Sequence, residues 1–246
     1  MNRSKIEWCD FSLNPIKGLC PVDCKDNQGK SYCYARRMYQ RFHWNSEIRF
    51  EVDVFDELFF LTHQRNHKPS RIFVGSTMEL FGEWIKPEWL ETIFRYCHIY
   101  SDHTFIFLTK QPQNLIKWSP FPTNCWVGVS LPMQQDQYWH DVTVNRFEVL
   151  ECLRNIKASV KFISFEPLLS QLCVGYYPIW WAEQFKKAGI NWLIIGQQTP
   201  VRKSTMPKIL WIDEVEDACK KADIPYFEKF NLKSLLNRDL IQEFPK

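Results

Sequence analysis

The sequence lacks any long apolar run. None of its apolar stretches approaches the length that a membrane-spanning helix needs, and its first residues contain no apolar segment of the kind that directs secretion. Internal repeats, low-complexity tracts and linker-like stretches are missing as well. We therefore expect one domain over residues 1–246, with no membrane partner.

The sequence also has no large excess of charge of one sign, and its number of cysteines is odd. The formal net charge of +3 neither demands nor opposes a nucleic-acid partner. Nine cysteines cannot all pair, which excludes a complete disulfide framework, and free thiols without a secretion signal indicate the reducing cytoplasm. Six of the nine are expected to pack as small apolar side chains: Cys9, Cys97, Cys125, Cys152, Cys173 and Cys219.

The other three cysteines lie close together in a polar segment. Cys20, Cys24 and Cys33 fall within residues 14–37, which open with turn formers and end in a helix-forming run. Closely spaced thiols bind soft metals, and the start of a helix favours the thiolate. Three thiols leave one coordination position open to an exchangeable molecule. On the residues alone, zinc with His43 as fourth ligand and an iron-sulfur cluster are equally compatible.

Predicted strands and helices alternate along a chain that is 45% apolar and 16% aromatic, enough for a substantial core. Strands are expected at 7–13, 71–75, 104–108, 125–130, 161–165 and 191–195. Helices are expected at 34–44, 53–63, 87–94, 113–118, 142–155, 179–188 and 208–222, with a last element at 225–230. Strands without polar alternation are typical of a parallel sheet covered on both faces. Six or seven such units predict a single-domain partial or complete (β/α) barrel, with a doubly wound sheet as the structural alternative.

Functional side chains of a parallel sheet gather where the strands end, since the strand-to-helix loops converge there. Lys110 and Glu166 end apolar strands, and they are candidates either for acid-base catalysis or for an ion pair across the mouth. Arginines and lysines near the same end could hold a carboxylate or phosphates: Arg36, Arg37, Arg202 and Lys203. The remaining polar residues at the strand ends are Asn14, Ser76, Thr77, Glu79, Ser130, Gln197, Gln198 and Thr199.

The cysteine loop resembles the cluster-binding loop of radical-SAM enzymes, usually C-x3-C-x2-C with an aromatic residue before the last cysteine. The first spacing fits and Tyr32 precedes Cys33, whereas eight residues separate Cys24 from Cys33. Most of the chain is similar to a phage-associated, uncharacterised three-cysteine-motif family regarded as radical-SAM-like. Seven phrases carry that resemblance: Asn14-Pro15, Cys33-Tyr34-Ala35, Met78-Glu79-Leu80-Phe81, Leu108-Thr109-Lys110, Trp126-Val127-Gly128-Val129-Ser130, Ser164-Phe165-Glu166-Pro167-Leu168-Leu169 and Trp192-Leu193-Ile194-Ile195-Gly196.

This resemblance implies a radical-SAM type of barrel in which Cys20, Cys24 and Cys33 hold a [4Fe-4S] cluster. S-adenosylmethionine would bind the open iron and be cleaved to start radical chemistry, with an electron donor required. The substrate implied is a nucleic-acid base or nucleotide, and a protein partner is a further possibility. The residues implied in cofactor binding are Tyr32, Ser76, Thr77, Glu79, Ser130 and Gln197.

Two other hypotheses follow from departures in the motif. The long spacing between Cys24 and Cys33, and the missing Gly-Gly-Glu after residues 71–75, favour a zinc-stapled, non-catalytic binding module on the same barrel. A metal-independent barrel enzyme would instead use Lys110 and Glu166 as its acid-base pair. The polar composition between the two cysteines is that of an exposed excursion.

Overall fold

The computed structural model describes residues 2–26, 28–63, 65, 68–131, 146–172 and 177–246. Eight strands form one sheet in the order β1-β2-β5-β6-β7-β8-β9-β10. Their bounds are β1 Asn2–Arg3, β2 Phe11–Leu13, β5 Arg71–Val74, β6 Thr104–Thr109, β7 Cys125–Ser130, β8 Val160–Phe165, β9 Trp192–Ile195 and β10 Tyr226–Glu228. Strand β1 pairs antiparallel with β2, and the other seven strands run parallel.

The strand order identifies the sheet as a partial barrel. From β2 to β10 each new strand is added on the same side of the previous one. A doubly wound sheet would reverse direction in its middle, whereas crossovers that always advance the same way curl the sheet around one axis. Within the described strands the order ends at β10 without a ladder back to β2, so the barrel stays open. The predicted (β/α) barrel is confirmed in its partial form.

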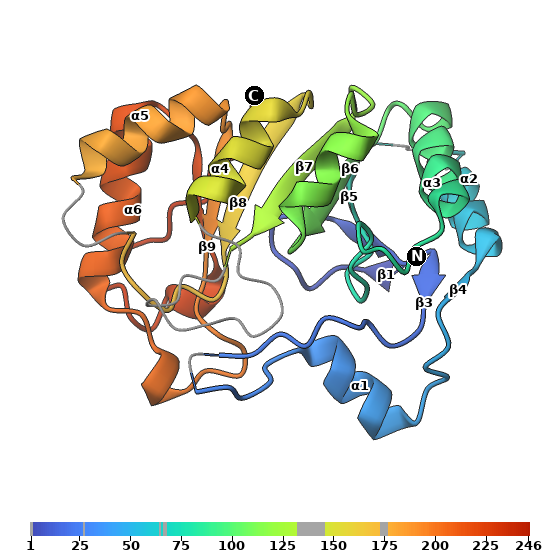
Figure 1. Ribbon diagram of the computed structural model, residues 1–246, viewed down its shortest axis with the longest axis horizontal. Helices are drawn as coiled ribbons and strands as arrows, with labels where there is room; N and C mark the ends of the chain where they lie inside the picture. The colour runs from blue at the N-terminus through green and yellow to red at the C-terminus, as the bar shows by residue number, and fades with distance from the viewer. Residues whose placement is uncertain (1, 27, 64, 66–67, 132–145, 173–176) are drawn as a thin grey trace.

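The helices cover the outer side of the curled sheet, except for α1, which lies apart from them (Figure 1). Their bounds are α1 Tyr34–Phe42, α2 Asp56–Thr62, α3 Pro87–Ile99, α4 Arg146–Asn155, α5 Pro178–Ala188 and α6 Ile209–Ala222. Short 3-10 turns are η1 Val52–Phe55, η2 Pro112–Trp118, η3 Lys203–Thr205 and η4 Phe230–Leu232. A two-stranded antiparallel sheet, β3 (Ile16–Lys17) and β4 (Arg49–Phe50), joins the segments on either side of α1. No helix in the described part of the chain has the length and apolar character needed to cross a bilayer.

Alternation along the strands produces two cores. In β6, Phe105 and Phe107 belong to the core beneath the outer helices, while Ile106 belongs to the core inside the curl. The inner core is filled largely by aromatic rings from several strands, among them Phe162 and Trp192, whose centroids lie 5.4 Å apart. Gly128 makes room for this packing, because a Cβ there would lie 2.4 Å from the Phe162 ring. These rings form the floor of the barrel mouth.

Most of the expected elements are present, with some changed boundaries. The first strand was expected over 7–13 but spans only Phe11–Leu13, because Trp8 and Cys9 turn into the inner core instead of pairing. The helix expected at 87–94 continues to Ile99, and the last element at 225–230 is the strand β10 followed by a 3-10 turn. Part of the helix expected at 142–155 and one packing cysteine, Cys173, lie outside the described residues.

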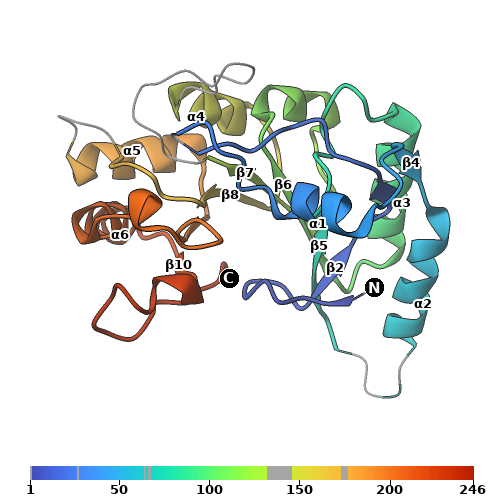
Figure 2. The ribbon, with the colours of Figure 1, turned by 90° about the horizontal axis from the view of Figure 1, so that it is seen from below.

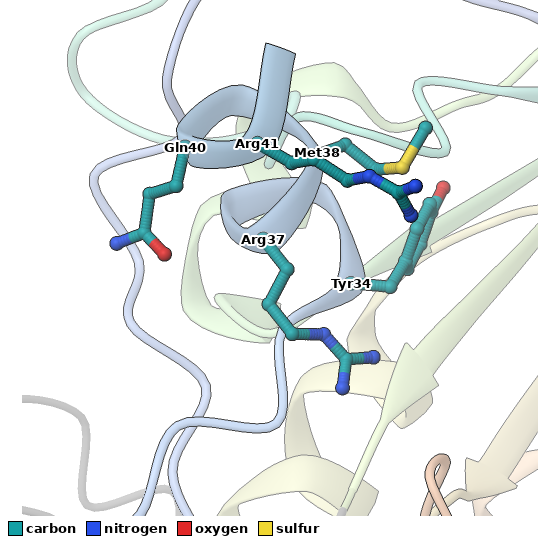
Figure 3. Close-up of a pocket in the computed structure, with 5 residues that line it drawn as sticks. All are labelled: Tyr34, Arg37, Met38, Gln40 and Arg41. Atoms are coloured by element: carbon teal, nitrogen blue, oxygen red, sulfur yellow. The ribbon is translucent and has the colours of Figure 1, made fainter. Parts of the chain in front are cut away.

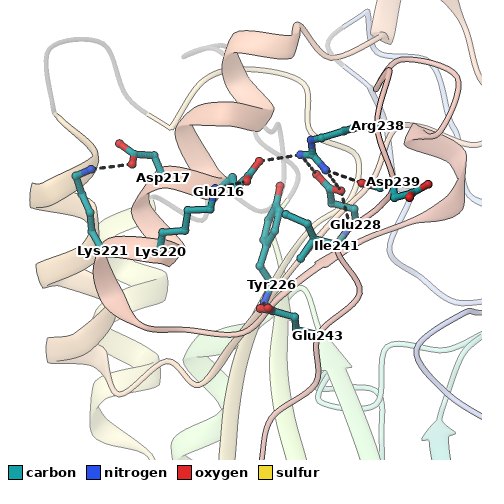
Figure 4. Close-up of polar contacts among 10 residues, drawn as sticks. All are labelled: Glu216, Asp217, Lys220, Lys221, Tyr226, Glu228, Arg238, Asp239, Ile241 and Glu243. Atoms are coloured by element: carbon teal, nitrogen blue, oxygen red, sulfur yellow. Dashed lines mark hydrogen bonds and ion pairs between the residues drawn. The ribbon is translucent and has the colours of Figure 1, made fainter.

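The C-terminal tail is stapled to β10 by a buried carboxylate (Figure 4). Glu228 accepts two hydrogen bonds from the Arg238 guanidinium, at 2.7 and 2.8 Å, and a third from the Ile241 amide at 2.8 Å. Arg238 also pairs with Glu216 on α6 at 2.7 Å. The tail brings the C-terminus to the side of the molecule where the N-terminus lies (Figure 2), and Phe244 stacks there under the Arg71 guanidinium at 3.8 Å.

Candidate functional site

The segment between the second and third cysteines is a small hairpin. Lys25 and Ser31 form an antiparallel bridge, and the Tyr32 amide donates to the Cys24 carbonyl at 2.9 Å. The hairpin therefore takes residues 25–31 out of the path between the two thiols. The eight-residue spacing is absorbed without separating the two side chains, since Cys24 and Cys33 interact closely enough to shift each other's pKa.

Helix α1 begins at the third cysteine. Cys33 is its N-cap, and its sulfur accepts the Arg36 amide at 3.5 Å. The hydrogen bond shared with Cys24 lowers the pKa of Cys33 and raises the pKa of Cys24, so one thiolate of the pair is favoured at the helix start. The prediction that the thiols are presented at the start of a helix is confirmed.

The first cysteine joins this pair from the other side of the loop. The Cys20 sulfur accepts the Glu79 amide at 3.4 Å, and it interacts electrostatically with both Cys24 and Cys33. Burial raises the pKa of Cys20, and the backbone N–H donors oppose that shift. The three sulfurs, soft ligands by nature, thus share one neighbourhood beside the loop that follows β5.

No group of three or more His, Cys, Asp or Glu side chains in the described ranges is arranged as a site for a metal ion. A [4Fe-4S] cluster distributes its thiolates over separate irons, so its ligands need to face a common space and not a single atom. His43 is excluded as a fourth ligand beside Cys33. It caps the opposite end of α1, and ten residues of helix span roughly 15 Å.

A buried aspartate anchors the hairpin to the other edge of the sheet. Asp26 accepts the amides of Gln28 and Lys30 at 3.0 Å each, and its second oxygen meets Arg202 at 3.3 Å and Gln198 at 3.4 Å. The Asp26 side chain is 0% exposed. Lys25, Gln28, Gly29 and Lys30 are exposed, as the polar composition predicted, so Asp26 is the buried anchor of a largely exposed excursion.

The loop after β5 is tied to the end of β2. The Asn14 side-chain oxygen accepts from the hydroxyls of Ser76 and Thr77, at 3.1 and 3.4 Å, and from the Thr77 amide at 3.3 Å. Gly75 starts the loop with a φ of +77°, and a Cβ there would lie 2.5 Å from the Leu80 side chain. Two of the predicted cofactor residues thus lie in a loop held beside the thiols.

Glu79 is a second buried carboxylate near the thiols. It accepts from the Thr109 hydroxyl at 2.6 Å, the Lys110 amide at 2.7 Å and the Phe81 amide at 3.1 Å. Burial raises the pKa of Glu79, and the three donors oppose that shift. Within this structure the carboxylate braces the loop against β6, while its own amide contacts the Cys20 sulfur.

Three polar side chains form a row across the ends of neighbouring strands. Lys110 follows β6 and donates to the Ser130 hydroxyl at the end of β7, and Ser130 is in register with Ser164 of β8. The Ser164 hydroxyl is buried, and no described residue forms a hydrogen bond with it. Lys110 also acts electrostatically on Cys24, favouring its thiolate. The row therefore extends from the thiols across the floor of aromatic rings.

The predicted ion pair between Lys110 and Glu166 is wrong. Glu166 pairs with Lys229, which follows β10, and Lys110 bonds to Ser130. Both lysines follow strands that lie two positions from β8, Lys110 on one side and Lys229 on the other. The sequence could not reveal which lysine pairs with Glu166, because strand order alone does not decide between them.

Two buried groups near Glu166 keep unused hydrogen-bonding capacity. The Tyr32 hydroxyl has no hydrogen-bond partner among the described residues. Burial raises its pKa, and the nearby Cys24, Glu166 and Cys33 side chains raise it further. Gln197 exchanges backbone and side-chain bonds with Asn231, but its side-chain oxygen is unpartnered. Buried polar groups without partners are rare, and they mark places where a ligand can complete the set.

The arginines next to the site differ in how they are used. Arg36 binds the Cys20 carbonyl at 3.0 Å and Asp23 at 3.5 Å, which makes it part of the loop framework. Arg202 is committed to Asp26. Arg37 donates to the Thr199 carbonyl at 3.5 Å, and it is exposed. The expectation was that Arg202 could hold a carboxylate or phosphates, and the carboxylate that it holds in this structure belongs to Asp26.

Several residues of the mouth were not singled out from the sequence as functional. Asp26, Ser164, Lys229 and Asn231 each contact, or lie in register with, a predicted site residue. Lys229 was recognisable in principle, since it directly follows a strand that parallels the others. The packing cysteines behave as expected, with Cys9, Cys97, Cys125 and Cys219 buried and Cys152 half-buried.

Comparisons with known proteins agree with this architecture. The family described as "Protein of unknown function (DUF5131)" matches residues 3–232. No curated protein matches the chain.

Solved structures of spore photoproduct lyase are similar in fold. The lyase complexed with dinucleoside spore photoproduct has a TM-score of 0.56 and 12% identity over 90% of this chain and 63% of that chain. A cysteine-to-serine mutant of the lyase has a TM-score of 0.53 and 14% identity over 79% and 57%. A double mutant with bound AdoMet and dinucleoside spore photoproduct has a TM-score of 0.50 and 13% identity over 90% and 63%. The chain thus spans about three fifths of the length of these lyases, and at this identity the likeness establishes the fold alone.

Proposed function

We propose that this chain, which belongs to the DUF5131 family of proteins of unknown function, acts over residues 1–246 as one radical-SAM-like enzyme domain of the cytoplasm. Cys20, Cys24 and Cys33 would hold a [4Fe-4S] cluster with an open iron for S-adenosylmethionine. The observation that carries the proposal is the hairpin, which brings Cys24 and Cys33 together despite their long spacing. The hairpin accommodates the eight residues between Cys24 and Cys33, which are the main departure from the three-cysteine pattern. Support at the level of fold comes from the radical-SAM enzyme spore photoproduct lyase.

When bound, the cluster and S-adenosylmethionine would supply a one-electron cleavage that generates a radical able to abstract hydrogen, given an external electron donor. The chain itself orients and shields the reactants. Asn14 holds the loop of Ser76 and Thr77 beside the thiols, so that loop is placed to bind the amino-acid part of the cofactor. Lys110 and Ser130 present a cation and a hydroxyl that suit its carboxylate or ribose.

The far side of the mouth is suited to the substrate. The Glu166–Lys229 pair, the Tyr32 hydroxyl and the unpartnered Gln197 oxygen combine donors and acceptors above an aromatic floor. Such a mixture matches a flat ring with polar edges, and a nucleic-acid base or nucleotide is the class we propose. One lyase structure contains a dinucleoside photoproduct, which supports the same class at the level of fold.

Metal content separates this proposal from its rivals. The protein is purified or reconstituted without oxygen and analysed for iron, sulfide and zinc. The wild-type chain is compared with a Cys20→Ala, Cys24→Ala, Cys33→Ala triple variant and with Cys152→Ala as the matched cysteine control on α4. We expect about four irons and four sulfides per chain in wild type and control, and neither in the triple variant. Stoichiometric zinc without sulfide would replace the enzyme by a zinc-stapled module.

Cofactor cleavage is then measured with a chemical reductant. Formation of 5′-deoxyadenosine should require the three cysteines and should fall strongly in Lys110→Met. Activity that survives the triple variant but is lost in Glu166→Gln would instead support a metal-independent acid-base enzyme.

A further inference from the structure

One face of α1 is exposed although it contains large side chains. Tyr34, Arg37, Met38 and Arg41 recur at helical spacing and form this face, which we call the arginine face. Tyr34 is 47% exposed and Met38 is 36% exposed. The buried side of the same helix is made by Ala35 and Tyr39, so packing of the fold does not require the arginine face.

The side chains of this face are arranged together. Figure 3 shows Tyr34, Met38 and Arg41 along one side of α1, with Arg37 near the start of the helix and Gln40 turned away. These five residues border a hollow of about 570 Å³. The Tyr34 hydroxyl donates to the Ser76 carbonyl at 2.7 Å, which fixes the ring against the loop beside the thiols.

The charge of the face has one sign. Helix α1 contains no acidic residue, and Asp23 in the preceding loop pairs with Arg36 and Lys25. Arg41 lies over the Phe42 ring at 5.3 Å, and Phe42 stacks on Trp44 with centroids 5.5 Å apart. Phe42 and Trp44 are 48% and 47% exposed, which continues the aromatic surface beyond the helix.

We propose that the arginine face binds the strand of a single-stranded or locally opened nucleic acid and guides one nucleotide to the mouth. Guanidinium groups match phosphates, and exposed aromatic and thioether groups offer bases a stacking platform. The position fits this use, because the residue before Tyr34 is the candidate ligand Cys33. The proposal rests on the proposed function for the class of substrate, but it concerns a surface outside the cluster and the cofactor loop.

The test is binding of a fluorescein-labelled 20-mer of thymidylate to the full chain, followed by anisotropy over a range of KCl concentrations. We compare wild type with Arg37→Gln/Arg41→Gln and with Lys186→Gln/Lys187→Gln, a matched pair of exposed cations on α5. Loss of two phosphate contacts should weaken binding on the order of tenfold and reduce the salt slope by about 1.4, at roughly 0.7 per contact for single strands. The α5 pair should behave as wild type.

Three results would overturn the proposal. These are no binding of the oligonucleotide by wild type, equal losses in the two double variants, or a salt slope unchanged by Arg37→Gln/Arg41→Gln. Self-association or protein binding through this face, without oligonucleotide binding, counts as the first result. Iron and sulfide are measured on the same samples. Oligonucleotide binding that depends on the two arginines, in protein without a cluster, would support the proposed surface and refute the proposed enzyme. A full cluster, with binding unaffected by Arg37→Gln/Arg41→Gln, would support the proposed enzyme and refute the surface.

Discussion

Removing Arg238 should destabilise the whole fold although it lies far from the thiols. Its guanidinium makes two hydrogen bonds to Glu228, whose side chain is 0% exposed. Among the described residues, the Ile241 amide is the one donor that the carboxylate keeps in Arg238→Ala. Breaking a buried ion pair costs about 3–5 kcal/mol. Because the Arg238 side chain is itself 36% exposed, water can replace part of the interaction, and we expect the lower limit of about 3 kcal/mol.

Lys221→Ala is the matched control, because the Lys221–Asp217 pair lies in the same region as the Arg238–Glu228 pair (Figure 4). Lys221 and Asp217 also meet at 2.7 Å, but their side chains are 42% and 46% exposed. An exposed pair at this helical spacing contributes about 0.3–0.5 kcal/mol. The Arg238–Glu228 and Lys221–Asp217 contacts thus have the same length, but their side chains differ in how deeply they are buried.

Urea unfolding followed by tryptophan fluorescence measures both effects. With a slope of about 3 kcal/mol per molar urea, the midpoint should fall by about 1 M in Arg238→Ala and by about 0.1 M in Lys221→Ala. Adding Glu228→Gln to Arg238→Ala should recover part of the loss, because the unpaired charge is then gone. Equal shifts in the two single variants, or no recovery in the double variant, would refute the reasoning. The pair matters for the site because Glu228 immediately precedes Lys229, the partner of Glu166.

Three further predictions concern the mouth. Gly75→Ala should lower the free energy of unfolding by about 1–3 kcal/mol more than Gly29→Ala, since both glycines have φ near +75° but only the first has a neighbour within 4 Å of the new methyl, as urea unfolding will measure. Asp26→Ala should reduce the iron bound per chain after anaerobic reconstitution while the circular dichroism spectrum stays native, because the hairpin loses its anchor; full iron content would contradict that role. Tyr32→Phe should keep the thermal midpoint but weaken the binding of S-adenosylmethionine or nucleotide, measured by calorimetry. Tyr226→Phe removes another unpartnered buried hydroxyl and should leave that binding unchanged. Equal binding by the two variants would exclude Tyr32 from the site.

The sequence by itself determined the alternating architecture and the location of the cysteines. Continuous apolar runs such as that of β9 are possible only in strands covered on both faces, so the parallel sheet could be read directly. The strand at Cys125–Ser130 was predicted with its observed bounds, because a β-rich run ends there at polar residues. Cys20, Cys24 and Cys33 stood out because three thiols lie close together in one polar segment.

Only the tertiary structure decided how the side chains pair. The partner of Glu166 is Lys229, which follows a strand two positions away in the sheet, and no local pattern encodes that pairing. The hairpin between Cys24 and Cys33 likewise depends on Asp26 reaching Arg202, which lies 176 residues later in the chain. Local periodicity fixes which residues face inward, whereas contacts between strand ends and loops arise from long-range closure of the chain.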